Sequence, residues 1–338
     1  MARRMSTDVV HALVCLPYLV HPRTMTPSPA ATAPSSVSAQ PLHPLLRREN
    51  DQGHTRYQYS SPQWLRVAPG VHAPRHAWEC SSPRERHLFL IEAARGKYGD
   101  EVVLAGVSAA LVLGLPLVGP LPHQVEVVAN GRTRRRTALL RRRATPAHAV
   151  QRAGCLTTPV PATLIDLARW HGVVMGVCAM DHALRTHLCT YDDLSTALEQ
   201  LVRGSAGAPG ARTAVHLADG RSESPGESLS RVRMWEARLP RPDLQVEKVV
   251  AGRRVRVDFS WSDPGLVGEF DGREKYHQAS YGRDPEDVLW DEKLREDEIR
   301  ASGLRIVRWV WEHAWSAGGT QMLRRLALYG VHPTGRRW

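Results

Sequence analysis

The feature that most constrains the fold is a pair of alternating segments at 253–261 and 266–271, joined by four turn-forming residues. Alternation of apolar and polar residues is typical of a β-strand with one buried face. The short connection predicts that the two strands pair side by side. The apolar residues expected on one face are Val255, Val257 and Phe259. Asp258 is then expected on the opposite face.

Further elements surround this pair of strands. The expected order is helix, three strands, helix and strand, at 227–239, 244–250, 253–261, 266–271, 284–302 and 304–311. Residues 221–226 are turn formers and are expected to link this part to the rest of the chain. We therefore predict a mixed α/β (α+β) domain at 221–338, built on a mixed sheet.

The preceding region, 41–220, predicts a second mixed α/β domain. Residues 64–73 suggest two short strands around a Pro-Gly turn. Helices are expected at 84–98, 107–115, 163–170, 172–185 and 191–202. Asn130-Gly131 lies between the strand-like segments 124–129 and 137–142, and this dipeptide is a strong signal for an antiparallel hairpin.

The N-terminal tail, 1–40, is expected to be disordered. Residues 24–40 are rich in Pro, Ala, Ser and Thr, a composition that cannot build a core. An apolar run at 9–20 follows two arginines, as in a secretion signal, but no suitable cleavage site lies near it. Met25 is a second candidate for the start of translation.

The chain is strongly basic. It has 45 Lys and Arg against 34 Asp and Glu, a net charge of +11 and a pI of about 9.9. Such a surplus favours a polyanionic partner, most often nucleic acid, and the alternative is a role in solubility alone. The five cysteines form no C-x-x-C pair, which argues against a zinc ribbon and favours a reducing, cytoplasmic location. No membrane partner is expected, because no segment is apolar enough to cross a bilayer.

The densest positive charge flanks the expected hairpin. The arginines concerned are Arg132, Arg134, Arg135, Arg136, Arg141, Arg142 and Arg143. Contact with the phosphates of nucleic acid is one interpretation. The other is a solvated edge strand whose charge prevents aggregation.

Three acids are candidates for a metal site. Glu269 and Asp271 are two residues apart on one strand, so their carboxylates leave the same face. Asp258 lies on the neighbouring strand, and the three are expected to converge. Carboxylate oxygens of this kind suit Mg²⁺ or Mn²⁺. The alternative is a set of solvent-facing acids that pair with nearby arginines.

Residues of 221–338 also follow one another in a distinctive order. They are Glu227-Ser228 with Arg231, 257–259, 267–272, Lys275-Tyr276, 291–295 and 304–309. Their order resembles the core of the PD-(D/E)XK restriction-endonuclease-like superfamily, in the branch related to very-short-patch-repair endonucleases. The resemblance implies a restriction-endonuclease-like fold and a metal-dependent DNA endonuclease or nickase.

The sequence departs from that family at two positions. Asp271 replaces the lysine that usually follows the strand acid, and Lys275 stands where relatives of this branch carry histidine. Lys275 is expected to orient the attacking water or to stabilise developing charge, with Lys293 as a second candidate; a surface lysine is the alternative. Glu227 is expected either to be an outer metal ligand or to stabilise a helix N-terminus. The candidate catalytic residues are Asp258, Glu269, Asp271, Lys275 and Glu227.

The first region carries a second resemblance, at 65–73, 104–115 and 158–168. These segments resemble AbiEi-type antitoxins of toxin–antitoxin systems, although the two periodic helices of a winged helix-turn-helix are missing before the strands. The resemblance implies an alternative function, a non-catalytic DNA-binding regulator or antitoxin with a relic nuclease fold and a cognate toxin as partner. An RNA-processing nuclease is a third interpretation, because the phosphodiester chemistry is the same.

Overall fold

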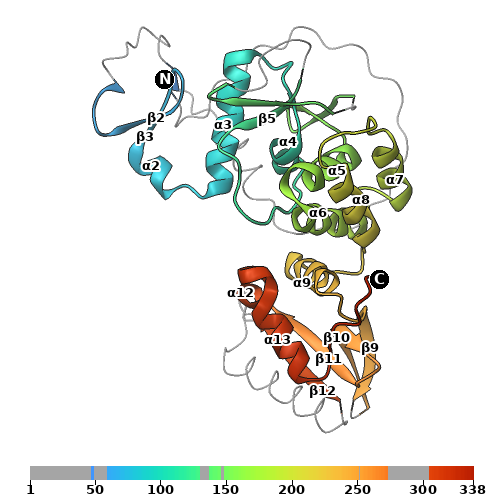
Figure 1. The fold of residues 1–338 in the computed structure, drawn as a ribbon. Helices are drawn as coiled ribbons and strands as arrows, with labels where there is room; N and C mark the ends of the chain where they lie inside the picture. Colours follow the sequence, from blue (N-terminus) through green and yellow to red (C-terminus); the bar gives the residue numbers. More distant parts are fainter. Residues whose placement is uncertain (1–46, 49–58, 130–136, 146–147, 251, 273–303) are drawn as a thin grey trace. The chain divides into compact units, whose positions relative to one another are not determined.

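The computed structural model describes residues 47–48, 59–129, 137–145, 148–250, 252–272 and 304–338. The tail at 1–40, the helix expected at 284–302, Lys275, Lys293 and four of the seven arginines lie outside these residues. The fold is mixed α/β, as the sequence predicts, and the described residues form three sheets (Figure 1). In the described residues, no helix is both long and apolar enough to cross a membrane.

The chain divides into two compact units, 1–166 and 167–338. The division falls inside helix α5 (Val160–His171), whereas the sequence places the boundary near residue 220. The turn-rich stretch 221–226 does not separate two units, because helices on both sides of it belong to the second unit and Ser222 is buried.

The first unit begins with a small antiparallel sheet. Its strands, in spatial order, are β1 (Arg47–Arg48), β3 (Val71–Pro74) and β2 (Trp64–Ala68). Gly70 has φ +74° in the turn between β2 and β3, a conformation that favours glycine, so the Pro-Gly turn is confirmed. Helices α2 (Arg75–Cys80) and α3 (Pro83–Tyr98) follow, and Ser82 with Glu85 forms a capping box at the start of α3.

A five-stranded sheet completes this unit. Its spatial order is β6 (Leu140–Arg143), β5 (Val125–Val128), β4 (Val103–Leu104), β8 (Cys155–Thr157) and β7 (Val150–Arg152). The buried helix α4 (Gly106–Val112) packs against β5. Strands β5 and β6 are parallel, with Val125 opposite Leu140, so the expected antiparallel hairpin is wrong. The 11-residue connection is long enough for a crossover, and sheet pairing overrides the Asn-Gly signal.

Helices open the second unit. After α5 come α6 (Val173–Arg185), α7 (Tyr191–Glu199), α8 (Ala208–Leu217) and α9 (Pro225–Glu236). Thr190 caps α7, because its hydroxyl accepts a hydrogen bond from the Asp193 amide. The backbones of α5 and α6 approach closely at Gly176, where a Cβ would lie 2.5 Å from that of Ala168.

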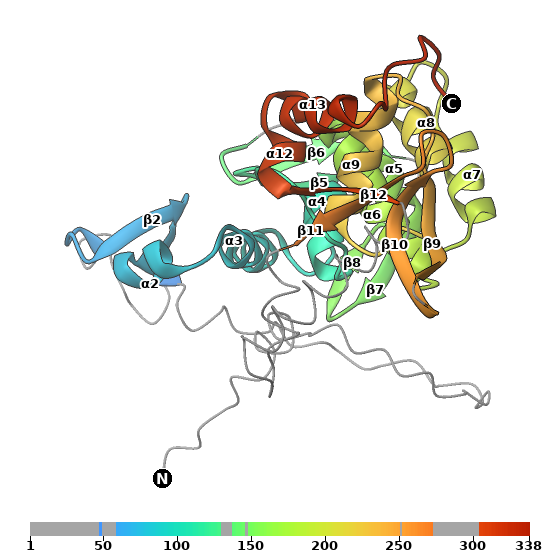
Figure 2. The same ribbon diagram turned by 90° about the horizontal axis from the view of Figure 1, so that it is seen from below.

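A four-stranded mixed sheet follows the helices. Its spatial order is β12 (Arg305–Val310), β11 (Leu266–Asp271), β10 (Arg253–Trp261) and β9 (Asp243–Val250). Strands β11 and β12 are parallel, and the other pairs are antiparallel. The chain ends with α12 (Trp311–Trp315), a 3₁₀ turn η3 (Ser316–Gly319) and α13 (Thr320–Leu328). Helix α12 lies beside α9, and α13 contacts the edge strand β12 (Figures 1 and 2).

Helix α9 packs on one face of this sheet. The indole nitrogen of Trp309 donates a 2.7 Å hydrogen bond to Ser230 Oγ on the helix. A Cβ at Gly226 would lie 2.0 Å from the ring of Phe270, so only glycine allows this approach. Trp309 is buried.

Candidate acidic site

Strand β10 loses its regular alternation at Asp258. Val257 packs in a buried cluster with Ile306, whereas the ring of Phe259 lies 5.3 Å from that of Trp309. Ile306 and Trp309 are three residues apart on one strand, so they face opposite sides of the sheet. The residues on either side of Asp258 therefore face opposite ways. Val255 packs against the same cluster as Val257, as expected, but the prediction that Phe259 shares their face is wrong.

The cause lies on the opposite strand. Gln245 of β9 has φ +53°, a left-handed conformation that non-glycine residues seldom adopt. The ladder pairs Val257 with Val246 and Phe259 with Leu244, but it skips the pair between them. Across this local break, side chains that would share one face of the sheet point to opposite faces. A β-bulge has the same effect on the side chains beside it.

The carboxylate of Asp258 occupies the place where β10 leaves β11. Ladder pairing between these strands ends at Phe259 and Gly268. Beyond it, the Phe270 amide donates a 2.9 Å hydrogen bond to Asp258 Oδ2, and Gln245 Nε2 donates a longer one of 3.3 Å to Oδ1. Asp258 is only 8% exposed, so its charge depends on these donors.

Glu227 approaches from the N-terminus of α9. Its carboxylate accepts hydrogen bonds from the Glu223 amide (2.9 Å), Ser224 Oγ (2.8 Å) and Gln245 Nε2 (2.8 Å). The amide of Gln245 therefore bridges Glu227 and Asp258. Burial, and next the negative charge of Asp258, raise the pKa of Glu227 to about 7. Both functions expected for Glu227 are compatible with this position, since it caps the helix and adjoins another acid.

Glu269 lies on β11 next to the contact between Asp258 and Phe270. Its Oε2 is 3.0 Å from Arg308 Nη2, and the register places Arg308 directly beside it on β12. Glu269 is 5% exposed. Phe270 faces α9, so Glu269 leaves the other face of the sheet. The acids thus approach the break from different sides.

The expected three-carboxylate cage is not preformed. Asp271 is half-buried on the same face of β11 as Glu269. Among the described residues, however, no three His, Cys, Asp or Glu side chains are grouped so that they could hold a metal ion. Mg²⁺ often needs only one or two carboxylates, together with waters and substrate phosphates. Asp258 and Glu269 fit that requirement in the type and number of their oxygen donors.

The arginine-rich segment is described only in part. Arg143 forms a 2.6 Å ion pair with Glu126, whose side chain is fully buried. The guanidinium of Arg142 lies 6.0 Å from the ring centre of Tyr98. Arg143 therefore neutralises an internal acid, and its contact with phosphates stays a prediction. Arg141 also lies on β6, while the remaining four arginines fall outside the described residues.

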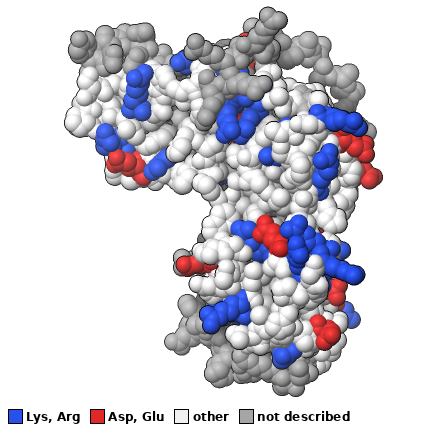
Figure 3. Space-filling view, viewed as in Figure 1, with Lys and Arg blue, Asp and Glu red and all other residues white. Residues whose placement is uncertain are grey.

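Net charge alone does not locate an interface. On the face drawn in Figure 3, basic side chains form several separate groups over both units, and some lie next to acidic side chains. A binding surface must therefore be argued from local geometry.

Sequence reasoning missed two residues of the acidic site, Gln245 and Arg308. Gln245 sits at a left-handed position that no local turn signal marks. Arg308 belongs to the apolar last strand, and only the register shows that it adjoins Glu269. The available signal was its position in the strand 304–311, where it is one of two arginines among apolar residues.

Comparison with known proteins gives distant relatives only. No family model matches the chain, and no solved structure matches it significantly. Two curated Mycobacterium tuberculosis proteins are each 33% identical over 156 residues, which is 46% of this chain and 55% of theirs. They are "Uncharacterized protein Rv2248" of strain H37Rv and "Uncharacterized protein MT2308" of strain CDC 1551. The chain thus spans about half the length of these relatives, whose names carry no activity.

Proposed function

We propose that the chain hydrolyses phosphodiester bonds in DNA as a Mg²⁺- or Mn²⁺-dependent endonuclease or nickase. One observation carries the proposal: Gln245 bridges the buried carboxylates of α9 and β10 at the break in the β9–β10 hairpin, and a third buried acid of β11 precedes the residue whose amide binds Asp258. The three acids are Glu227, Asp258 and Glu269. Buried acids are rare unless they are paired or bind a cation, and two bridged acids with a third on the adjacent strand favour a functional site.

The proposed roles follow from the contacts. Asp258 and Glu269 would hold the cation, with Gln245 and the Phe270 amide fixing the orientation of Asp258. A bound Mg²⁺ would polarise the phosphate and lower the pKa of its water. Glu227 changes its proton occupancy near neutral pH and so sets the charge beside Asp258. Asp271 as a further ligand and Lys275 as a stabiliser of developing charge complete the proposal.

The test is cleavage of supercoiled plasmid by the purified full chain. We expect nicking or linearisation with Mg²⁺ or Mn²⁺ and none with chelator. Asp258→Asn and Glu269→Gln should each lower the rate at least 10²-fold, on the order of the loss of an essential electrostatic group. Thr196→Val, a change on α7 outside this sheet, is a preparation control that should cut normally. Equal cutting by Asp258→Asn would assign the activity to another site or to a contaminant.

A second function is favoured by the internal partners of the acids. Glu269 already pairs with Arg308, and Asp258 already accepts a hydrogen bond from the Phe270 amide, so both acids have internal partners without a cation. A non-catalytic DNA-binding regulator or antitoxin would need nothing more. Binding of duplex DNA without cleavage, over all metals tested, would favour this function over the nuclease. Both functions imply a cytoplasmic location.

A further inference from the structure

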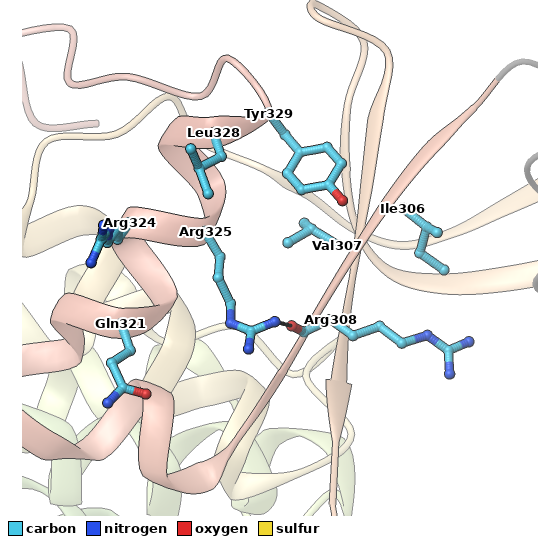
Figure 4. Close-up of a pocket in the computed structure, with 8 residues that line it drawn as sticks. All are labelled: Ile306, Val307, Arg308, Gln321, Arg324, Arg325, Leu328 and Tyr329. Atoms are coloured by element: carbon cyan, nitrogen blue, oxygen red, sulfur yellow. Dashed lines mark hydrogen bonds between the residues drawn. The ribbon is translucent and has the colours of Figure 1, made fainter.

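A groove runs between the edge strand β12 and helix α13. It encloses about 550 Å³. The polar and exposed residues that line it are Arg308, Gln321, Arg324, Arg325, Leu328 and Tyr329 (Figure 4). No lining residue is acidic. The groove is therefore a hollow with one sign of charge, a shape that concentrates its electrostatic potential.

One face of α13 is buried and the other is exposed. Met322 and Leu326 are fully buried and attach the helix to the unit. Gln321, Arg324 and Arg325 are exposed on the outer face, at the spacing of one helical turn. Leu328 follows on the same face and is 78% exposed. The arginines are thus presented by a helix that is already anchored.

Among the described residues, no acidic side chain pairs with the arginines of α13. Residues 313–338 contain four arginines and no Asp or Glu. Arg325 Nη1 reaches the carbonyl of Arg308 at 3.4 Å, and neither Arg324 nor Arg325 forms an ion pair with a described residue. Two adjacent guanidinium groups at one wall of a groove repel each other, and an anion between them removes that repulsion.

Arg308 connects the groove to the acidic site. Figure 4 shows its side chain leaving the strand on the side away from Arg325, while its carbonyl oxygen meets the Arg325 guanidinium. The guanidinium of Arg308 reaches Glu269 at 3.0 Å. Arg308 therefore contacts Arg325 of the groove through its backbone carbonyl and Glu269 through its side chain.

We propose that the β12–α13 groove binds the sugar–phosphate backbone of duplex DNA through Arg324 and Arg325. Guanidinium groups match the geometry of phosphate oxygens and stay charged, and Gln321 and Tyr329 add neutral hydrogen-bonding groups of the kind that contact DNA backbones. The identity of the ligand as DNA rests on the proposed function. The groove would place the duplex across β12, next to the strand that carries Glu269.

The experiment measures duplex DNA binding by the full chain in chelator, over a series of salt concentrations. Arg324→Gln with Arg325→Gln should weaken binding and flatten the plot of log affinity against log salt by roughly two units. Arg203→Gln with Arg212→Gln removes the same charge from two exposed residues of the helical segment. This control should lower the slope much less. All four residues are exposed, so both variants should fold, and circular dichroism checks this.

Equal slopes for the two double variants would overturn the groove proposal, since net charge alone would then explain the effect. Cleavage is assayed separately with Mg²⁺. A flattened slope in a protein that never cuts DNA would support the groove and refute the nuclease. Metal-dependent cutting with an unchanged slope would support the nuclease and refute the groove.

Discussion

The guanidinium of Arg231 on α9 donates a 2.6 Å hydrogen bond to the carboxylate of Asp181 on α6, and both side chains are buried. The same carboxylate accepts hydrogen bonds from Ser228 Oγ (2.6 Å) and from the Asp219 amide (2.7 Å). Ser228 is the residue after Glu227. Helix α6 therefore fixes the helix that delivers Glu227 to the acidic site, although 47 positions separate Asp181 from Ser228.

Asp181→Asn should destabilise the second unit. The substitution leaves Arg231 as a buried cation without its counter-ion, a change that typically costs about 3–5 kcal/mol. The free energy of unfolding, measured with urea, gives the value. Glu236→Gln is the matched control, because Glu236 pairs with Arg233 at the surface and its loss should cost less than about 1 kcal/mol. Similar losses for the two variants would contradict the buried pair.

Glu227→Gln should flatten the dependence of stability on pH. The folded protein binds the Glu227 proton more tightly than the unfolded chain, because its pKa rises from 4.5 to about 7. Its contribution to stability therefore falls as pH rises through this interval and is constant above it. The shift corresponds to on the order of 3 kcal/mol. Glutamine keeps one acceptor oxygen, to which the Glu223 amide and Gln245 can still donate.

The measurement is the difference in unfolding free energy between wild type and Glu227→Gln from pH 4.5 to pH 8. The variant should gain relative stability as pH rises. Parallel curves would show that the Glu227 carboxyl titrates at its usual pKa.

Gly226→Ala should be destabilising although alanine favours helices. Its Cβ would lie 2.0 Å from the Phe270 ring, so the helix or the ring must move at a cost of about 1–3 kcal/mol. Gly210→Ala on α8 is the control, since the nearest atom lies 3.3 Å from its Cβ and alanine adds helix propensity. In thermal unfolding, Gly210→Ala should have a clearly higher melting temperature than Gly226→Ala. The reverse order would contradict the packing of α9 on the sheet.

The arginine-rich segment should divide into structural and binding residues. Arg143→Gln removes the partner of the fully buried Glu126, so it should lower stability by about 3 kcal/mol or more and leave DNA binding of the folded protein unchanged. Arg134→Gln, Arg135→Gln and Arg136→Gln together should instead flatten the salt dependence of DNA binding. Unfolding and binding assays on both variants check this. An unchanged slope in the triple variant would leave these arginines as a solvated edge.

Local patterns in the sequence predicted individual elements well. The strands at 253–261 and 266–271 have the predicted bounds, because alternation and a short turn are local properties. Helices α3 and α6 begin and end within a residue or two of the predicted positions. The C-terminal helix α13 was missed, although its buried residues Met322 and Leu326 stand at the spacing of one helical turn.

Relationships between elements were harder to predict. Strands β5 and β6 are parallel despite the Asn130-Gly131 signal, because pairing within a five-stranded sheet outweighs a local turn preference. The acidic site was predicted from alternation, and alternation fails at Asp258 because of the opposite residue, Gln245. A single residue in an unusual backbone conformation thus determined which side chains meet.

At Gln245, the left-handed backbone favours glycine for stability, whereas the geometry of the acidic site requires a side chain. Glycine adopts φ near +53° without steric cost, whereas a side chain there costs about 1 kcal/mol or more. Glycine, however, has no amide to span Glu227 and Asp258. Gln245→Gly, a substitution that relieves backbone strain, therefore also removes the amide that links two buried acids.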